Sequence, residues 1–463
     1  MVDRFGDDAT RRRFLKGGTA VGAALLAGCT GGDSEGGQTT TEGTTETTEA
    51  DETTTEETTT EDSSYSVSMP PVGELTFDSV PETWVANNGS WADMGVALGV
   101  EPPKGVWLPS RYHTRYYDEI PDVSVDKSGM TALYSDGVSK EVFYELDADV
   151  HVIDSNFLMN RFKGWEQADV DEISENVGPF FGNSIFSTGY SWHEDYPYLS
   201  LYEAFEKLSQ VFQRRDRYEQ FATLHDEFQS KISDLVPDSE SERPRVAIVW
   251  AAGNEPEEFS PYLIGEGASF KQWRDLRVRD AFAETDVKDF HSSRGKIDYE
   301  TLLEIDPDVL LCRGHESQTA EEFQNTVVSF MEDHDTASAL SAVQNGTVFR
   351  GGPLYQGPIT NLVLTERAAR QVYPDAVGDE DLFDRQRVAD IVNVPKLTCI
   401  SPAATTSARL PSASETSEPS TQPRRPSRYP VVAVSSGTVY ASPFTMSATR
   451  WRSNRSSSPT ASG

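Results

Sequence analysis

Hydrophobic residues recur every three or four positions between Tyr198 and Leu235, a stretch without proline or glycine. This spacing places them on one face of an α-helix, which at 1.5 Å per residue would be about 50 Å long. We therefore predict one long helix over residues 198–236, while allowing for a break near Arg214–Asp216. The apolar positions of this helix are Leu201, Phe205, Leu208, Phe212, Tyr218, Phe221, Leu224, Phe228 and Ile232.

A second pattern occurs twice, at a separation of 159 residues. Glu141–Ile153 has the pattern of a short amphipathic helix, an Asp-Ala-Asp turn and a buried strand, and Glu300–Cys312 repeats this order with an Asp-Pro-Asp turn. Such a unit is half of a parallel-sheet domain, so two copies this far apart predict two similar lobes. The alternative is a chance similarity between two unrelated units.

The predicted elements divide the central part of the chain into two lobes. Residues 65–197 form the N-terminal lobe, 198–236 the interlobe helix and 237–393 the C-terminal lobe, which begins with the buried strand Arg245–Trp250. The fold class we predict is α/β, with two Rossmann-like α/β lobes joined by one long helix and a cleft between the lobes. Ligands of open parallel sheets bind at the carboxyl ends of the strands, so we expect the binding site in this cleft.

The N-terminus carries two targeting patterns. The Arg-Arg-Arg-Phe-Leu-Lys run at residues 11–16 resembles a twin-arginine export signal, and Leu26–Cys29 resembles a lipobox, whose cysteine is acylated. The apolar run between them is shorter than the roughly 20 residues of a membrane span. We expect residues 1–29 to be a signal and Cys29 to carry lipid, which anchors the chain to the outer face of the cytoplasmic membrane. The alternative is a chance cysteine in a poorly folded N-terminus.

Composition separates both flanks from the lobes. Residues 30–64 are rich in threonine and glutamate and predict a disordered stalk. The chain has 75 acidic and 40 basic residues and a net charge of −35. Such an excess of acidic residues is typical of proteins from organisms living in high salt. It argues against nucleic acid as a partner, because binding to phosphates needs a basic surface. Residues 394–463 carry a net charge of +6, so this tail is predicted to be disordered or translated out of frame; a genuine basic tail is the alternative.

The central region resembles the substrate-binding lipoproteins of ABC importers for ferric siderophores, haem and cobalamin, in which one rigid helix joins two α/β lobes. The resemblance covers roughly residues 73–393. It is carried by the order and spacing of Pro81–Val85, Met94–Val100, Glu141–Val150, Tyr198–Leu235, Glu304–Leu311 and Gly346–Arg350.

The resemblance implies a capture and delivery function without catalysis. Glu141 and Glu300 match the glutamates with which members of this family dock onto arginines of the permease dimer, which works with its ATPase. The ligand would be an iron chelate, such as a ferric hydroxamate or another siderophore, haem or cobalamin. The protein would be a monomer with no cofactor apart from the lipid on Cys29. The alternative for the two glutamates is that they are ordinary solvated side chains.

Three loops combine arginine with aromatic residues, which can hold an anionic or aromatic metal chelate. We predict that their ligand-binding residues are Arg111, Tyr112, Arg115, Tyr116, Tyr190, Trp192, Arg294, Arg313 and Tyr355. Packing and surface ion pairs are the alternative roles for these side chains.

The seven histidines form no motif of a known catalytic or zinc-dependent enzyme, so we predict no enzymatic activity and no resident metal. Two other functions stay open. One is direct binding of zinc or manganese for an ABC importer, with His113 beside His193 or His315. The other is a cell-surface scaffold without a transport role, although this would not explain the two lobes.

Overall fold

The N-terminal lobe is built on a parallel sheet with strand order β5-β4-β3-β6. The computed structural model describes residues 64–162 and 164–394. An antiparallel hairpin of β1 and β2 precedes the sheet, and helices α1 to α4 and two 3-10 turns, η1 and η2, complete the lobe. The elements are β1 Tyr65–Met69, β2 Gly73–Phe77, β3 Trp84–Ala86, α1 Gly89–Ala97, β4 Gly105–Val106, η1 Pro109–Arg111, η2 Thr114–Glu119, β5 Thr131–Ala132, α2 Lys140–Leu146, β6 Val150–Val152, α3 Ser155–Arg161 and α4 Gln167–Asn176.

The C-terminal lobe has its own sheet, in which β11, β10 and β7 are parallel, β8 is antiparallel to β7, and the short β9 also pairs with β7. Its elements are β7 Arg245–Ala251, β8 Phe259–Tyr262, α7 Lys271–Asp275, β9 Arg279–Asp280, α8 Phe290–Ser293, α9 Tyr299–Ile305, β10 Val309–Arg313, α10 Ala320–Phe323, α11 Ser329–Asp333, α12 Ser341–Gln344 and β11 Val348–Arg350. The strands predicted over residues 245–250 and 346–350 are therefore present.

The repeated sequence pattern forms the same structure in both lobes. Helix α2 ends at Asp147 with φ 45° and α9 ends at Asp306 with φ 44°, and a parallel strand follows each. The second aspartate of each copy accepts a hydrogen bond from a backbone N–H group at the start of the neighbouring strand. Asp149 accepts from Thr83 N, just before β3, at 2.7 Å, and Asp308 accepts from Arg245 N, the first residue of β7, at 2.7 Å. Because the two copies lie in separate sheets, the prediction of two similar lobes is confirmed.

The helix predicted over residues 198–236 is present as two helices, with the break close to the place allowed near Arg214–Asp216. The segment forms α5 (Leu201–Val211) and α6 (Arg215–Leu235), separated by Gln213 with a left-handed φ of 51°. The two helices fold back on each other, since the Phe205 and Phe221 rings lie 5.9 Å apart and the Tyr202 and His225 rings 4.0 Å apart. The apolar positions therefore pack between two helices, and α6 alone spans about 32 Å.

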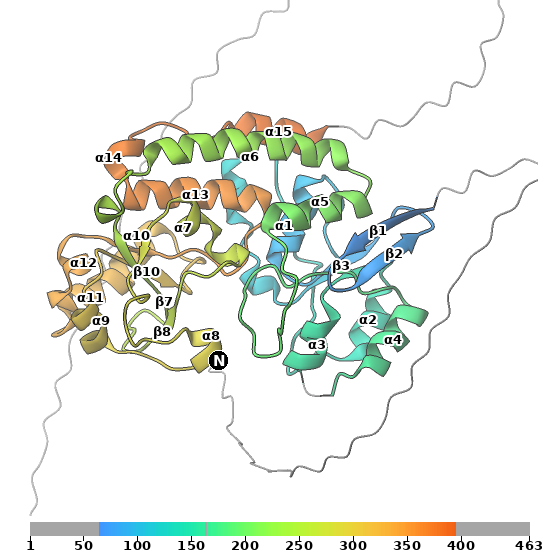
Figure 1. Cartoon of the computed structure of the whole chain (residues 1–463), viewed down its shortest axis with the longest axis horizontal. Coiled ribbons are helices and arrows are strands. Elements are labelled where there is room, and N and C mark those ends of the chain that lie inside the picture. The colour runs from blue at the N-terminus through green and yellow to red at the C-terminus, as the bar shows by residue number, and fades with distance from the viewer. Residues whose placement is uncertain (1–63, 163, 395–463) are drawn as a thin grey trace, which may run out of the picture. The chain divides into compact units, whose positions relative to one another are not determined.

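Three helices bridge the lobes (Figure 1). Helix α6 contacts α1 of the N-terminal lobe and α7 of the C-terminal lobe, and it also packs against α13 (Pro358–Val372) and α15 (Arg385–Asn393); the short α14 (Pro374–Val377) lies between these two in the chain. The largest hydrophobic core accordingly contains residues of both lobes, such as Trp84, Phe221 and Ile359. This shared core makes the connection between the lobes stiff.

The predictions for the signal at residues 1–29, the lipid on Cys29, the stalk and the tail lie outside the described residues, apart from Ser64 and Val394 at their edges. Within the described residues, none of the helices has the length and apolar character needed to span a membrane.

Candidate ligand-binding cleft

A cavity of about 240 Å³ lies between the lobes. Residues of the N-terminal lobe form one wall, and the loops that follow β8 and precede α9 form the other. Because sites for drug-sized ligands usually measure about 300–1,000 Å³, the lobes must separate to admit a bulky solute. The lining residues are Ser187, Thr188, Gly189, Leu263, Gly265, Phe270, Asp289, His291 and Ser292.

Predicted aromatic residues of the N-terminal lobe lie beside this cavity. The Tyr190 ring stacks on Trp192 with centroids 4.5 Å apart, and it meets the ring of the cavity-lining His291 at 6.2 Å across the lobes. Burial raises the pKa of the Tyr190 hydroxyl well above its ordinary value, so this hydroxyl stays neutral and can donate a hydrogen bond. The loop thus offers flat aromatic surface with a polar edge.

Arg313 is the most unusual side chain near the cavity. It ends β10 and is 0% exposed, and its guanidinium carbon lies 4.4 Å from the centroid of the Phe270 ring, which lines the cavity. Its Nη2 donates to the Ser269 carbonyl at 2.6 Å, but Nε and Nη1 have no partner among the described residues. Burial lowers the pKa of Arg313 to about 10, so the side chain is still a cation at neutral pH.

Arg111 and Tyr355 meet at the same cleft from opposite parts of the chain. The Arg111 guanidinium lies over the Trp250 ring of the C-terminal lobe at 5.6 Å, and its positive charge opposes the rise that burial causes in the pKa of the Tyr355 hydroxyl. Tyr355 in turn touches Phe186 of the N-terminal lobe, with ring centroids 5.3 Å apart. These contacts cross between the lobes in both directions.

Arg294 is exposed and follows the cavity-lining Ser292, with its guanidinium 5.3 Å from the Phe290 ring. The neighbouring Asp289 is engaged by protein groups, since it accepts from the backbone N–H groups of His291 at 2.7 Å and of Leu263 at 3.0 Å. Six predicted residues therefore lie near this cavity without being among its lining residues: Arg111, Tyr190, Trp192, Arg294, Arg313 and Tyr355.

The remaining three predicted residues are bonded to other protein groups, and their role in ligand binding stays a prediction. Tyr112 is 3% exposed and bonds Tyr117 hydroxyl to hydroxyl at 2.7 Å, while Tyr116 is 4% exposed and donates to Glu316 of the C-terminal lobe. Arg115 donates to the backbone carbonyls of Glu316 and Gln318. Arg115 and Tyr116 thus connect the two lobes, whereas Tyr112 is bonded within the N-terminal lobe.

Glu316 is the residue of this region that sequence reasoning missed. It follows Arg313 by three positions and receives two hydrogen bonds from Arg367 of α13, at 3.0 and 3.1 Å. Burial by itself raises the pKa of Glu316, but the charge and hydrogen bonds of Arg367 outweigh burial and bring the pKa down to about 2. Its only sequence signal was its place after a strand of the repeat.

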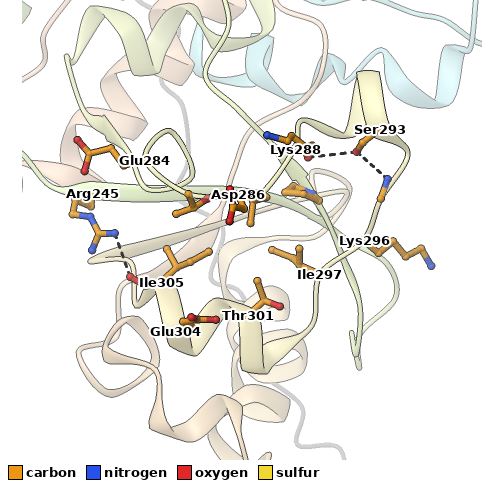
Figure 2. A pocket seen from close by; sticks show the side chains of 14 residues that line it. Arg245, Glu284, Asp286, Lys288, Ser293, Lys296, Ile297, Thr301, Glu304 and Ile305 are labelled. Carbon is orange, nitrogen blue, oxygen red and sulfur yellow. Dashed lines mark hydrogen bonds between the residues drawn. The ribbon is translucent and has the colours of Figure 1, made fainter.

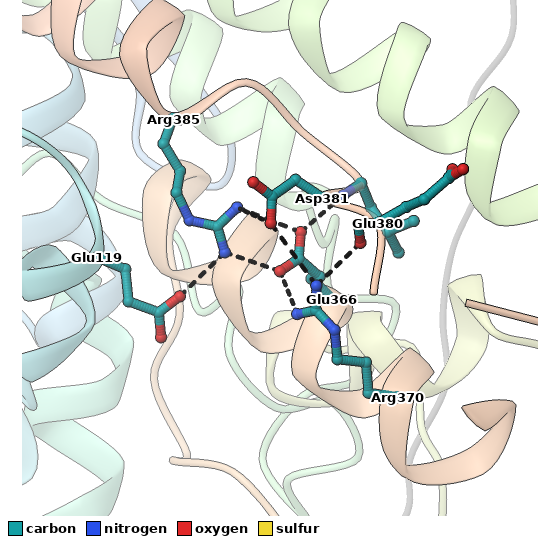
Figure 3. Close-up of polar contacts among 7 residues, drawn as sticks. Glu119, Glu366, Arg370, Glu380, Asp381 and Arg385 are labelled. Atoms are coloured by element: carbon teal, nitrogen blue, oxygen red, sulfur yellow. Dashed lines mark hydrogen bonds and ion pairs between the residues drawn. The ribbon is translucent and has the colours of Figure 1, made fainter. Parts of the chain in front are cut away.

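A second ionic contact fastens α15 (Figure 3). The buried Glu366 of α13 accepts from Arg385 of α15 at 2.7 Å and from Arg370. Arg385 also reaches Glu119 at the end of η2, at 3.2 Å. The C-terminal helix is thereby tied both to α13 and to the N-terminal lobe.

A larger cavity of about 830 Å³ lies in the C-terminal lobe alone (Figure 2). Its lining residues all come from the range 245–305. The nine predicted ligand residues line neither this cavity nor the smaller one, but Tyr190 and Arg313 contact His291 and Phe270 of the smaller cavity. Arg245, at one end, is occupied by the carbonyls of Ile305 and Asp306 at 3.2 and 3.4 Å. We assign the ligand site to the smaller cavity, because only that cavity is shared by both lobes.

Glu141 and Glu300 occupy equivalent places in the two lobes. Each lies in the first turn of its helix, α2 or α9, and each side chain is exposed. Their position suits contact with a partner, although the structure contains no partner that would test it.

Among residues 64–162 and 164–394, no three His, Cys, Asp or Glu side chains are grouped so that they could hold a metal ion. His315 is 4% exposed, and burial lowers its pKa. The histidine pairs considered for direct metal binding thus gain no support from this arrangement.

The model of the periplasmic binding protein family matches residues 134–354. The match begins before the first copy of the repeat and ends after β11, so it covers both copies, the interlobe helices and most of the cleft residues. This segment, slightly less than half of the chain, is therefore similar to the periplasmic binding protein family, whose members bind solutes and are not enzymes. A comparison with curated proteins finds no match.

Solved structures of low sequence identity resemble the chain. A periplasmic binding protein from Veillonella parvula is 18% identical, with a TM-score of 0.48, over 67% of this chain and 92% of that protein. The petrobactin-binding protein of Bacillus subtilis is 16% identical, with a TM-score of 0.46, over 68% of this chain and 99% of that protein. A triscatecholate siderophore-binding protein of the same species is 15% identical, with a TM-score of 0.43, over 64% and 95%.

Proposed function

We propose that this protein is the extracytoplasmic solute-binding component of an ABC importer and that it captures an iron chelate of the siderophore type. The observation that supports the proposal is that arginine and aromatic side chains contact one another across the lobes beside one cavity. Arg111 contacts Trp250 across the lobes, and Tyr190 contacts His291. A solute bound between these side chains would therefore touch both lobes at once. The family match supports solute binding, and the chemistry of the cleft supports a chelate.

The residues suit a large, flat and partly polar ligand. Stacked rings such as Tyr190 and Trp192 give rigid contact area, and arginine presents a planar fork to paired oxygen atoms. A bare zinc or manganese ion would instead need several His, Asp or Glu ligands in one place. No observation favours that rival over a chelated metal.

Delivery would use the outer surface of the lobes. Lipid on Cys29 would hold the protein at the membrane, and Glu141 and Glu300 would pair with arginines of a permease dimer. The stiff connection through α6 and α13 would limit the lobes to a small hinge motion, so that the spacing of the two glutamates reports whether the cleft is closed.

The direct test is a fluorescence titration of the purified protein with a ferric tris-catecholate, a ferric tris-hydroxamate, haem, cobalamin, zinc and manganese. We expect one of the chelates to quench tryptophan fluorescence with a Kd of about 1 μM or tighter, which corresponds to roughly −8 kcal/mol. Trp192→Phe and Trp250→Phe should each weaken the quenching, because these rings lie at the cleft. Trp165→Phe is the control, since Trp165 packs against Phe143 inside the N-terminal lobe.

Binding of zinc or manganese with none of the chelates would replace the proposal by direct metal-ion transport. Quenching by none of the panel would instead leave the scaffold function in place.

A further inference from the structure

The two walls of the interlobe cavity are joined to each other through their backbones. Ala268 N donates to the Ile185 carbonyl at 2.8 Å, and Ser269 N donates to the Phe186 carbonyl at 3.1 Å. A Cβ atom on Gly267 would collide with the same Phe186 carbonyl, so the two backbones approach closely. Because the four bonded residues are buried, separation of the whole lobes at this place would break buried hydrogen bonds.

The chain beside this junction forms a short loop with different contacts. Residues 189–195, which we call the aromatic flap, carry the rings of Tyr190 and Trp192 and are bounded by Gly189 with φ 83° and Asp195 with φ 49°. Glycine adopts a positive φ without strain, and a Cβ atom at Gly189 would meet nothing within 4 Å. Glycine therefore serves the turn of the chain at this position, where the flap leaves the cavity wall.

The aromatic flap lies between the lobes but is hydrogen-bonded on one side alone. The Tyr190 ring lies 6.2 Å from the Phe157 ring of α3 and 6.2 Å from the His291 ring of α8, and the flap lies between these two helices in Figure 1. Among the described residues, the flap forms hydrogen bonds within itself and with Tyr198, and none with the C-terminal lobe. An outward movement of the flap would therefore leave the hydrogen bonds between the lobes intact.

Tyr198 holds the flap in its observed position. Its hydroxyl group accepts from Gly189 N at 3.1 Å and is bonded to His193 Nδ1 at 2.5 Å. Tyr196, two residues earlier, is fixed to the lobe by a hydrogen bond to the buried Asp154 at 2.8 Å. One hydroxyl group thus connects the start and the middle of the flap to a fixed part of the N-terminal lobe.

We propose that the aromatic flap is a gate, whose movement admits the solute while the rest of the two lobes stays bonded. The separation that a bulky solute needs is thereby confined to residues 189–195, and the lobes need only a small hinge motion. Displacing the rings of Tyr190 and Trp192 adds space to the cavity of about 240 Å³. When the flap returns, the flat faces of these rings cover the bound solute. This inference rests on the proposed function.

A disulfide bond tests whether the lobes must move apart beside the flap. A Cβ atom on Gly265 would lie 3.5 Å from the Thr188 hydroxyl oxygen, so cysteines at these two cavity-lining positions are close enough to form a disulfide. The variant Thr188→Cys/Gly265→Cys also carries Cys29→Ser and Cys399→Ser, which leaves the buried Cys312 as the other thiol. The probes are a ferric tris-catecholate, a ferric tris-hydroxamate, haem and cobalamin. We expect the oxidised variant to bind the same probe as its reduced form, with a Kd within about threefold.

Tyr198→Phe keeps the ring but releases the flap. Because the flap is then open more often, stopped-flow fluorescence should show association and dissociation rates of the bound probe that are both raised at least about fivefold, while the Kd changes by less than about threefold. Tyr144→Phe is the matched control, since Tyr144 is 44% exposed on α2 and its hydroxyl donates to Glu172 at 3.1 Å on the outer surface of the lobe.

Hydrogen exchange tests the gate in the ligand-free protein. The His193 amide is bonded within the flap, whereas the Ala268 and Ser269 amides are bonded across the lobes. If the flap moves alone, the His193 amide should exchange at least about 100-fold faster than the other two.

Equal exchange of the three amides would show that the whole lobes open together and would overturn the inference. Loss of probe binding on oxidation that reduction restores, or wild-type rates in Tyr198→Phe, would overturn it as well and leave chelate transport intact. Failure of the wild-type protein to bind any of the four probes would overturn the proposed function, and the exchange measurement would still decide for or against the gate.

Discussion

The hydroxyl group of Tyr116 in the N-terminal lobe donates a hydrogen bond to the carboxylate of Glu316 in the C-terminal lobe. Arg367 of the bridging helix α13 donates two further hydrogen bonds to the same carboxylate. Since this contact is buried, any opening of the cleft must pivot about it or break it. The segment that carries Tyr116 also carries Arg111, which reaches the cleft, so one short stretch of chain connects ligand site and hinge.

Replacing Glu316 by alanine should strongly destabilise the protein. The substitution leaves the partly buried Arg367 without its carboxylate, and breaking a pair whose acidic partner is fully buried costs about 3–5 kcal/mol. The free energy of unfolding from urea titration measures the effect. Glu304→Ala, an exposed glutamate of α9, is the control and should change this free energy by less than about 0.5 kcal/mol. Equal effects of the two substitutions would show that the ionic contact is not important for stability.

The same carboxylate makes stability depend on acid. Because the pKa of Glu316 falls from its ordinary value of 4.5 to about 2 on folding, its contribution is complete above about pH 4.5 and is lost as the pH falls toward 2. Glu316→Gln should therefore remove part of the acid sensitivity between these values. The measurement is the free energy of unfolding as a function of pH. A variant that loses stability with acid as steeply as the wild type would contradict this assignment.

Asp93 should make the free energy of unfolding depend on pH in the opposite direction. It lies in α1 and accepts from Ile359 N of α13 at 2.9 Å and from the Tyr117 hydroxyl at 2.7 Å, and burial raises its pKa from 3.8 to about 6. The folded state thus favours the protonated form, so this contribution is complete below about pH 3.8 and is lost as the pH rises through 6.

Asp93→Asn keeps a hydrogen-bond acceptor but has no charge to titrate. We expect it to match the wild type at pH 4 and to gain up to about 3 kcal/mol over it by pH 7. Asp216→Asn, on the exposed start of α6, is the control and should follow the wild-type profile. The same decline of stability between pH 4 and 7 in Asp93→Asn would rule out Asp93 as its source.

Gly357 should tolerate no larger side chain. A Cβ atom at this position would collide with the Asp93 carboxylate and lie 2.7 Å from the Ser90 carbonyl, where α1 meets the start of α13. Gly357→Ala should therefore cost about 1–3 kcal/mol in thermal or urea unfolding. Gly129→Ala, where a Cβ atom would meet nothing within 4 Å, should be neutral or slightly stabilising. A neutral Gly357→Ala would mean that the two helices can separate without loss.

The repeat and the two lobes could be predicted from the sequence for a physical reason. The Asp-x-Asp turn ends a helix and bonds the next strand by local rules, as the left-handed Asp147 and Asp306 demonstrate. Arginines at the carboxyl ends of strands, such as Arg313, are placed by sheet topology. These features depend on residues that are close in the chain, or on the general rule that the carboxyl ends of parallel strands lie at one edge of the sheet.

The sequence was less informative where partners lie far apart in the chain. A helical spacing continues through Gln213, but periodicity does not reveal that Phe205 packs on Phe221 and so requires a reversal. In the same way, Tyr112 and Tyr116 have the composition of a binding loop, and only the distant partner Glu316 gives Tyr116 a structural role. Long-range packing decided these cases.

The docking function proposed for Glu141 and Glu300 can be separated from ligand binding, because both side chains are exposed and neither lines the cavity. We expect the double substitution Glu141→Ala and Glu300→Ala to abolish uptake of an iron chelate into cells, while the affinity measured by fluorescence titration is unchanged. Each exposed pair is worth only about 0–1 kcal/mol, so single substitutions should reduce uptake partially.

Glu219→Ala, an exposed glutamate of α6, is the matched control for this change in charge and should transport normally. Wild-type uptake by the double variant would assign permease recognition to another surface. Loss of both uptake and affinity would instead indicate that α2 and α9 support the cleft, since the strand after each helix leads toward the ligand site.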